Sequence, residues 1–278
     1  MQRLWVMVPN TVSTDEAAIL GISKPSAWHT VDFTSQVAYS LWAGSNYEFD
    51  STSLRIGFSS FLTPKQVIDL HVQLPSTTSG GSKVVVTTAT VLKEQAVPGY
   101  DASLYRSERI DCTSQDGKTK IPMSLVYRVG EGESVTQLKN RPVLLYGYGS
   151  YGSCMDPSFD FKRSVLLDRG VVYVVAHIRG GGEMGRGWYE DEGKYLTKQN
   201  TFRDFTDCAA SLIESGLTSA KRLAIVGRSA GGLLIGAAVN MRPELFRAAV
   251  ADVPFVDVLN TMCDPTIPLT VTEWEEWG

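Results

Sequence analysis

The sequence predicts an α/β fold preceded by a segment rich in β-strands. Short stretches rich in Val, Ile, Thr and aromatic residues run through residues 1–97, as is typical of sandwiches, barrels and propellers. After the segment AVPGY at 96–100, apolar strands alternate with helical patterns, which indicates a parallel sheet. The 278 residues are enough for one large domain or two ordinary ones.

The first part contains seven candidate strands, separated by clusters of Ser, Thr, Asn, Gly and Pro. No fixed-period repeat is evident, so the strands alone leave the type of β-domain open. The segment STTSGGS at 76–82 is expected to be the tip of a hairpin. The predicted strands cover residues 4–8, 18–22, 28–33, 37–42, 54–59, 67–74 and 83–91.

The second part combines buried strands with helices that end at glycines. A helix is expected over 159–169, stopped by Gly170, and another begins with Asn200 as its cap and ends at Gly216. A third helix is expected over 230–241. The predicted strands cover residues 142–146, 171–178, 222–226 and 248–253; the nearly continuous apolar run at 171–178 is typical of a strand covered on both faces.

Composition and charge argue against several classes of protein. With 43% hydrophobic residues and ordinary Gly and Pro counts, the chain is expected to be globular, neither disordered nor collagen-like. The formal net charge of −4 and the absence of a Lys/Arg run argue against binding nucleic acid through a basic face. Because no segment approaches 18 apolar residues, we expect no membrane span.

The cysteines predict neither a metal site nor a disulfide framework. Cys112, Cys154, Cys208 and Cys263 form no CxxC pair and have no nearby histidine to complete a zinc set. Four thiols in a chain of this length favour a reducing compartment, and we expect a cytoplasmic protein. No cofactor motif is found, and the oligomeric state is not predicted.

The pentapeptide GRSAG at 227–231 is the strongest functional signal in the chain. Apolar LAIV precedes it and LLI follows Gly232, which is the strand–turn–helix context of a nucleophile elbow. Such an elbow holds Ser229 in a strained conformation that exposes its hydroxyl. Side chains at Gly227 and Gly231 would clash there, and Gly232 would let the helix pack closely. A phosphate-binding turn is the alternative, but a P-loop lysine and a GxGxxG motif are absent.

A general base for this serine is not evident. Ser229 needs a base to remove its proton, and the fold with this elbow places the acid and then the histidine after the serine. The 49 residues that follow (278 − 229) contain no histidine. His29 and His71 lie in the β-rich part. His177 ends a predicted strand, and we interpret it as a polar residue with a local hydrogen-bond partner rather than as the base.

Several long motifs, in order, resemble the prolyl oligopeptidase family of serine peptidases, with the oligopeptidase B branch the most similar. The resemblance covers residues 98–278 and is looser over 1–97. Because the motifs are long and non-repetitive, the match is specific. They are LYGYGSYG at 145–152, HIRGGGE at 177–183, KQNTF at 198–202, GRSAGG at 227–232, NMRP at 240–243 and IPLT at 267–270.

The resemblance implies a domain division and roles for individual residues. Residues 1–97 would be the C-terminal part of a β-propeller, and 98–278 the N-terminal part of an α/β-hydrolase domain that cleaves short peptides. Ser229 would be the nucleophile. The backbone N–H of Ala230 and the hydroxyl of Tyr148 would form the oxyanion hole, in which each donor is worth roughly 10²–10³-fold in rate. Tyr151 would line the specificity pocket.

Acidic residues near the end of the chain imply cleavage after Arg or Lys. Glu273 and Glu275 match positions that bind a basic side chain in such family members, and carboxylates can bind a guanidinium by paired hydrogen bonds. Without the resemblance, an exposed acidic stretch would be the preferred interpretation. Asp156 matches a further acidic subsite, but Ser158 stands where the family has a second acid. Proline-specific cleavage is the alternative specificity.

The family's catalytic Asp and His would come after Gly278, and most of its propeller before Met1. We therefore expect an incomplete chain that is inactive alone. Two other hypotheses remain: a non-catalytic product that at most binds peptides, and an unrelated esterase in which His177 is the base.

Overall fold

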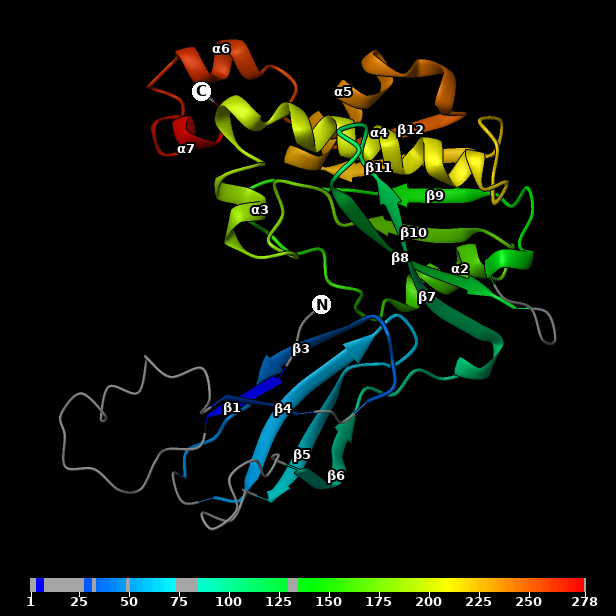
Figure 1. The fold of residues 1–278 in the computed structure, drawn as a ribbon, viewed down its shortest axis with the longest axis vertical. Coiled ribbons are helices and arrows are strands. Elements are labelled where there is room, and N and C mark those ends of the chain that lie inside the picture. Colours follow the sequence, from blue (N-terminus) through cyan, green and yellow to red (C-terminus); the bar gives the residue numbers. More distant parts are fainter. Residues whose placement is uncertain are drawn as a thin grey trace.

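The computed structural model describes residues 4–7, 28–31, 34–48, 51–73, 85–129 and 135–277. Within these ranges the chain forms an antiparallel sheet of four strands, a mixed sheet of six strands and a separate pair of strands. Figure 1 shows the antiparallel sheet in blue and cyan below the mixed sheet, which carries the longer helices. None of the helices in the described ranges is both long and apolar enough to cross a membrane.

The antiparallel sheet has the strand order β3-β4-β5-β6, so each strand pairs with the next in the sequence. Its apolar face is formed by Ile56, Phe58, Ile68 and Leu70. The predicted strand 18–22 and the predicted hairpin tip 76–82 lie outside the described residues. The strands are β1 (Leu4–Met7) and β2 (Trp28–Val31), which pair with each other, and β3 (Tyr39–Ala43), β4 (Ser53–Ser60), β5 (Gln66–Gln73) and β6 (Val85–Glu94).

The mixed sheet has the order β12-β11-β9-β10-β8-β7. β9 to β12 run parallel, as predicted, whereas β8 is antiparallel to β10 and β7 antiparallel to β8. The antiparallel strands β7 and β8 had not been predicted, and they make the sheet mixed. The strands are β7 (Tyr105–Thr113), β8 (Lys120–Arg128), β9 (Val143–Tyr146), β10 (Val172–Ala176), β11 (Leu223–Arg228) and β12 (Ala248–Asp252).

Helices connect the parallel strands, and α5 has the predicted bounds. Two expectations were wrong. The helix predicted over 159–169 is a 3₁₀ turn followed by the short α2, and Asn200 lies inside α4 rather than capping it. The helices are α2 (Ser164–Leu167), α3 (Arg186–Glu190), α4 (Gln199–Glu214), α5 (Ala230–Met241), α6 (Val258–Cys263) and α7 (Thr270–Trp277), with 3₁₀ turns η2 (Ala102–Leu104), η3 (Val135–Gln137), η4 (Phe161–Arg163), η5 (Tyr195–Thr197) and η6 (Pro243–Leu245).

Both faces of the mixed sheet are covered, because successive side chains of a strand point to opposite faces. Leu125 of β8 packs in the core that contains Phe205 of α4. Its neighbour Val126 packs in a second cluster with Phe61, from the end of the antiparallel sheet, and Leu167 of α2. This second cluster joins the two sheets through apolar contacts.

Candidate active site

Ser229 lies between β11 and α5 with a strained backbone, at φ 57° and ψ −118°. Such conformations cost about 1–3 kcal/mol and persist only where surrounding contacts impose them. The Ser229 N–H donates to the carbonyl of Asp252 at 2.9 Å, and the Ser229 carbonyl accepts from the N–H groups of Gly232 at 2.8 Å and Phe255 at 3.1 Å. The turn is therefore held from α5 and from the segment after β12.

The three glycines of the turn are required by close backbone contacts. A Cβ on Gly227 would lie 2.2 Å from the carbonyl oxygen of Gly231, and one on Gly231 would lie 2.8 Å from that of Gly147. A Cβ on Gly232 would lie 2.5 Å from the Cα of Pro254. This geometry agrees with the clashes predicted at the first two positions, and it identifies Pro254 as the group that approaches Gly232.

Tyr148 and Ala230 both adjoin this turn. The Tyr148 ring is next to Gly231, with its Cδ2 3.3 Å from the place where a Cβ would be. Burial raises the pKa of Tyr148, so the phenol stays neutral and able to donate. Ala230 is the buried first residue of α5, where a backbone N–H has no acceptor within the helix.

Helix α7 brings Glu273 to Tyr151. The Tyr151 hydroxyl donates to Oε2 of Glu273 at 2.5 Å, and Nε1 of Trp277 donates to the same oxygen at 3.1 Å. The ring centroids of Tyr148 and Tyr151 are 6.4 Å apart. Tyr148, Tyr151 and Glu273 therefore form one continuous surface that begins at the elbow.

Glu275 and Asp156 lie elsewhere. The Glu275 side chain is 93% exposed and its nearest cation is Lys194, at 3.8 Å. Asp156 accepts a hydrogen bond from Ser40 of β3 at 3.0 Å and lines a cavity of about 240 Å³ between the two sheets. Neither residue contacts Tyr151 or Glu273 through a hydrogen bond in the described part of the chain.

His177 is buried and locally paired, as predicted. Its Nε2 lies 2.7 Å from the Ser124 hydroxyl and its Nδ1 3.3 Å from a carboxylate oxygen of Glu183. His177 follows β10, and β9 separates β10 from the β11 strand that leads to Ser229. Neighbouring strands lie about 4.8 Å apart, so the strand that leads to His177 is roughly 10 Å from the strand that leads to Ser229.

Two buried ion pairs beside the site were not predicted from the sequence. Lys198 donates to Glu276 at 2.7 Å, and both side chains are buried. Arg179 donates twice to Asp204, from Nε at 2.8 Å and from Nη2 at 2.6 Å. Lys198 belongs to the KQNTF motif and Arg179 to HIRGGGE, but a motif names no partner, and these partners lie 78 and 25 residues away.

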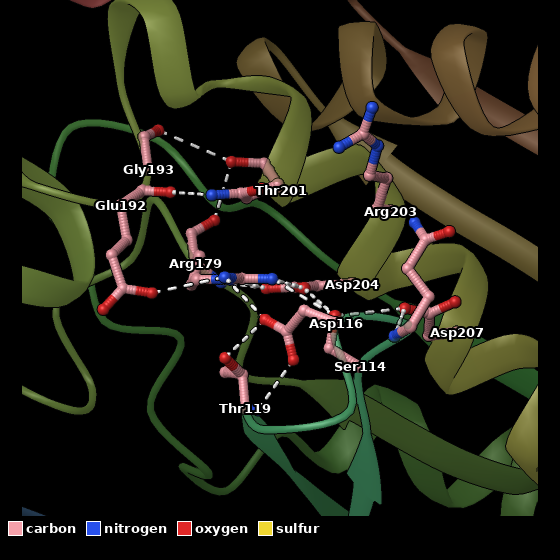
Figure 2. Close-up of polar contacts among 12 residues, drawn as sticks. Ser114, Asp116, Thr119, Arg179, Glu192, Gly193, Thr201, Arg203, Asp204 and Asp207 are labelled. Carbon is pink, nitrogen blue, oxygen red and sulfur yellow. Dashed lines mark hydrogen bonds and ion pairs between the residues drawn. The ribbon is translucent and has the colours of Figure 1, made fainter.

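Figure 2 shows Arg179 at the centre of a polar network. Its guanidinium also contacts Asp116 and Glu192, each at 3.2 Å, and its carbonyl accepts from the Thr201 hydroxyl at 2.7 Å. The Asp204 carboxylate raises the pKa of Arg179. Within the described residues, no cluster of His, Cys, Asp and Glu has the arrangement needed to hold a metal ion.

Known proteins resemble this chain in sequence and in fold. The prolyl oligopeptidase family model matches residues 157–278. Dipeptidyl aminopeptidase BI of Pseudoxanthomonas mexicana is 48% identical over 241 residues, which cover 87% of this chain and 31% of that protein. The chain belongs to the prolyl oligopeptidase family. Protease 2 of Moraxella lacunata is another relative, 45% identical over 86% of this chain and 32% of its own length.

Solved structures of the family have the same fold. Oligopeptidase B from Trypanosoma brucei, with covalently bound antipain, has a TM-score of 0.77 and 45% identity over 91% of this chain and 34% of its own. Oligopeptidase B from Leishmania major has a TM-score of 0.80 and 41% identity over 99% and 35%. These likenesses confirm the predicted fold class, part of an α/β-hydrolase domain preceded by the end of a β-propeller. The chain spans about a third of the length of these family members.

Proposed function

We propose that Ser229 is the nucleophile of a serine peptidase that cleaves short peptides by acyl transfer. The observation that carries this proposal is the strained Ser229 backbone at a strand–turn–helix junction, with Tyr148 against the same turn. In the proposed reaction the Ser229 oxygen bonds to the carbonyl carbon of the scissile peptide. The C–N bond of the peptide then breaks, and the amine leaves with the proton that a general base took from Ser229. Water hydrolyses the acyl-enzyme to the carboxylic acid and returns the proton to Ser229.

Two donors are available for the oxyanion that forms during this attack. The Ala230 N–H is the first of α5 and has no acceptor within the helix. The neutral Tyr148 phenol belongs to the segment after β9, next to Gly231. Preorganised donors of this kind each contribute roughly 10²–10³-fold in rate. Gly147 and Gly149 flank Tyr148, and a Cβ on them would lie 2.6 Å from the Phe205 ring and 2.4 Å from the Thr201 methyl group, so both glycines let the loop that carries Tyr148 pack closely on the interior.

The reaction also needs a general base. Both ring nitrogens of His177 are engaged by Ser124 and Glu183, and the ring lies two strands away from Ser229. His71 lies on β5 of the antiparallel sheet. We therefore propose that the base is supplied from outside the side chains that the structure describes, and that these residues alone do not catalyse.

For specificity, we propose that the peptidase cleaves after Arg or Lys and that Glu273 receives the basic side chain. Its carboxylate adjoins Tyr151 on the surface that begins at the elbow, and a carboxylate binds guanidinium with strong, directional hydrogen bonds. Glu275 and Asp156 contact other groups here, so we assign them to subsites farther from the scissile bond. We further propose a cytoplasmic location, in keeping with the free thiols of all four cysteines.

The nucleophile is tested by labelling with a fluorophosphonate probe, using the protein at the length that its natural gene encodes. We expect labelling of the wild type and none of Ser229→Ala, because the probe reacts with an activated serine. Ser164→Ala is the control and should label like the wild type, since that serine caps a turn on the far side of the sheet. A folded wild type that does not label would favour the non-catalytic hypothesis.

The specificity is tested with fluorogenic peptides that carry Arg, Lys, citrulline or Pro before the scissile bond. Citrulline matches Arg in size but has no charge, so the Arg-to-citrulline ratio of kcat/KM reports the carboxylate. We expect a high ratio in the wild type and a reduced ratio in Glu273→Gln. Faster cleavage after Pro than after Arg would instead favour the proline-specific alternative.

A further inference from the structure

The Lys198–Glu276 pair is almost completely removed from solvent, with exposures of 7% and 2%. Placing two charges in the interior costs free energy, and replacing such a pair by apolar residues is often neutral or stabilising. Stability alone is therefore a weak explanation for this pair. Its other contacts indicate what it does.

The Lys198 ammonium donates three hydrogen bonds, all to groups beside the site. Besides Glu276, Nζ donates to the Gly149 carbonyl at 2.7 Å and to the Ser150 hydroxyl at 2.8 Å. These two residues join Tyr148 to Tyr151 directly in the sequence. The ammonium therefore fixes the loop that carries both tyrosines.

Glu276 fixes the same loop from helix α7. Its Oε1, which accepts from Lys198, also accepts from the backbone N–H of Tyr151 at 3.3 Å. Glu273 lies one turn earlier on α7, where its carboxylate meets the Tyr151 hydroxyl. Tyr151 is thus held at its backbone and at its hydroxyl by two acids of one helix.

An aromatic chain connects this arrangement to the nucleophile. The Lys198 ammonium lies 4.8 Å from the centre of the Trp277 ring. Trp277 contacts Tyr151, with centroids 5.9 Å apart, and Phe255, with centroids 5.3 Å apart. The Phe255 N–H in turn donates to the Ser229 carbonyl.

We propose that the Lys198–Glu276 ion pair is a positioning device, which sets the Tyr148–Tyr151 loop and Glu273 relative to Ser229. The inference rests on the proposed function, because it assigns the pair to the same site. Its role is to hold the oxyanion donor and the acceptor of the basic side chain at a constant separation. A misplacement of about 1 Å in such a site can cost 10²-fold in rate.

The test is the double variant Lys198→Met/Glu276→Leu, made in the protein at its natural gene-encoded length. Both charges leave together, so neither stays buried and unpaired, and we expect the fold to be retained. We expect kcat/KM for an Arg peptide to fall by about 10–100-fold. The fall should be smaller for a citrulline peptide, because Glu273 no longer faces the substrate guanidinium correctly.

Arg186→Ala/Glu190→Ala is the matched control, since it removes an exposed ion pair from α3. Wild-type kcat, KM and Arg-to-citrulline ratio in the folded Lys198→Met/Glu276→Leu protein would overturn the inference. If the double variant does not fold, the inference is tested with Glu276→Gln, for which the Arg-to-citrulline ratio is measured. This variant keeps the acceptor oxygen and removes the charge, so we expect a reduced ratio, and an unchanged ratio would overturn the inference.

These outcomes are distinct from failure of the proposed function. A wild type that neither labels at Ser229 nor cleaves Arg peptides would overturn the proposed function. A wild type that does both, beside a folded double variant with the same kinetics, would overturn only the positioning role.

Discussion

The two buried ion pairs both connect to Gly149 through hydrogen bonds, but they differ in the other groups that they contact. Lys198 bonds directly to the Gly149 carbonyl and shares Glu276 with Tyr151. Arg179 is linked to Gly149 through the Thr201 hydroxyl, which lies within hydrogen-bond distance of both carbonyls. Besides Asp204, its guanidinium donates to Asp116, Glu192 and Ser114. The first pair belongs to the site, whereas the second joins the loop after β10 to α4 and to the β7–β8 turn. This difference teaches that burial alone does not identify a functional ion pair.

The largest expected effect comes from breaking the Arg179 pair. Arg179→Met leaves the fully buried Asp204 carboxylate without its partner cation. Removing one partner of a buried ion pair in this way costs about 3–5 kcal/mol. Chemical denaturation of the variant and the wild type measures this loss in free energy of unfolding.

Arg179→Met/Asp204→Leu is the matched control, and it should lose much less stability because no buried charge remains. Its Arg-to-citrulline ratio should stay near that of the wild type, unlike the ratio of Lys198→Met/Glu276→Leu. A comparable fall in both ratios would remove the distinction between the pairs.

A smaller effect is expected at Gly180, where the two regions meet. Gly180 has φ +98°, and a Cβ there would lie 2.0 Å from the Gly149 carbonyl oxygen, which Lys198 binds. Gly180→Ala should therefore destabilise the fold by about 2–3 kcal/mol, as backbone strain and a steric clash combine, and lower kcat/KM as well. Thermal unfolding and peptide hydrolysis measure the two effects.

Gly185→Ala separates these causes. Gly185 has a similar φ of +103°, with ψ 176°, but a Cβ there would meet nothing within 4 Å. Only backbone strain, of about 1–3 kcal/mol for this conformation, is therefore expected, without a loss of kcat/KM. Equal losses at both positions would mean that contact with Gly149 has no part in the effect.

The smallest effect is a pH dependence at the edge of the Arg179 network. The pKa of Asp116 lies below its ordinary 3.8, mainly because the N–H and hydroxyl of Thr119 donate to it. As the pH falls through about 3.8, the unfolded state therefore takes up a proton at Asp116 while the folded state still keeps the carboxylate ionised. The stability from Asp116 is present in full above that pH and is lost in acid.

Asp116→Asn should therefore be less stable than the wild type at pH 7, and the difference should narrow below about pH 4. Thermal unfolding across this range measures it. Asp111→Asn, an exposed position on β7, is the control. A difference between Asp116→Asn and the wild type that is constant from pH 7 to pH 3 would contradict the assignment.

Local patterns were sufficient for much of the parallel sheet and for the elbow. The bounds of α5 and the glycines of the turn could be predicted from a short apolar, glycine-rich stretch, and the clash that Gly227 avoids is with its sequence neighbour Gly231. The groups that approach Gly231 and Gly232 are distant in sequence, Gly147 and Pro254, and only the structure identifies them. β7 and β8 were missed. β7 is an edge strand whose residues are mostly polar and partly exposed, so it has no apolar run to indicate it.

The acidic stretch at the chain end was harder to interpret, because its three glutamates have three environments. Glu273 meets Tyr151, Glu275 is exposed, and Glu276 is buried against Lys198. A helix turns about 100° per residue, so neighbours in sequence face different surroundings. Which of them face the protein depends on what α7 packs against.

The sequence by itself determined the elbow, the candidate nucleophile that we propose at its tip and the resemblance to a peptidase family, because each is carried by short stretches of residues close together in the chain. Only the tertiary structure decided which charges are paired, which tyrosines share a surface with Ser229 and that His177 lies apart from it. Those relations join residues tens to more than a hundred positions apart. Folding brings such residues together when whole helices and strands pack against one another. A local sequence pattern therefore does not predict which distant residues come into contact.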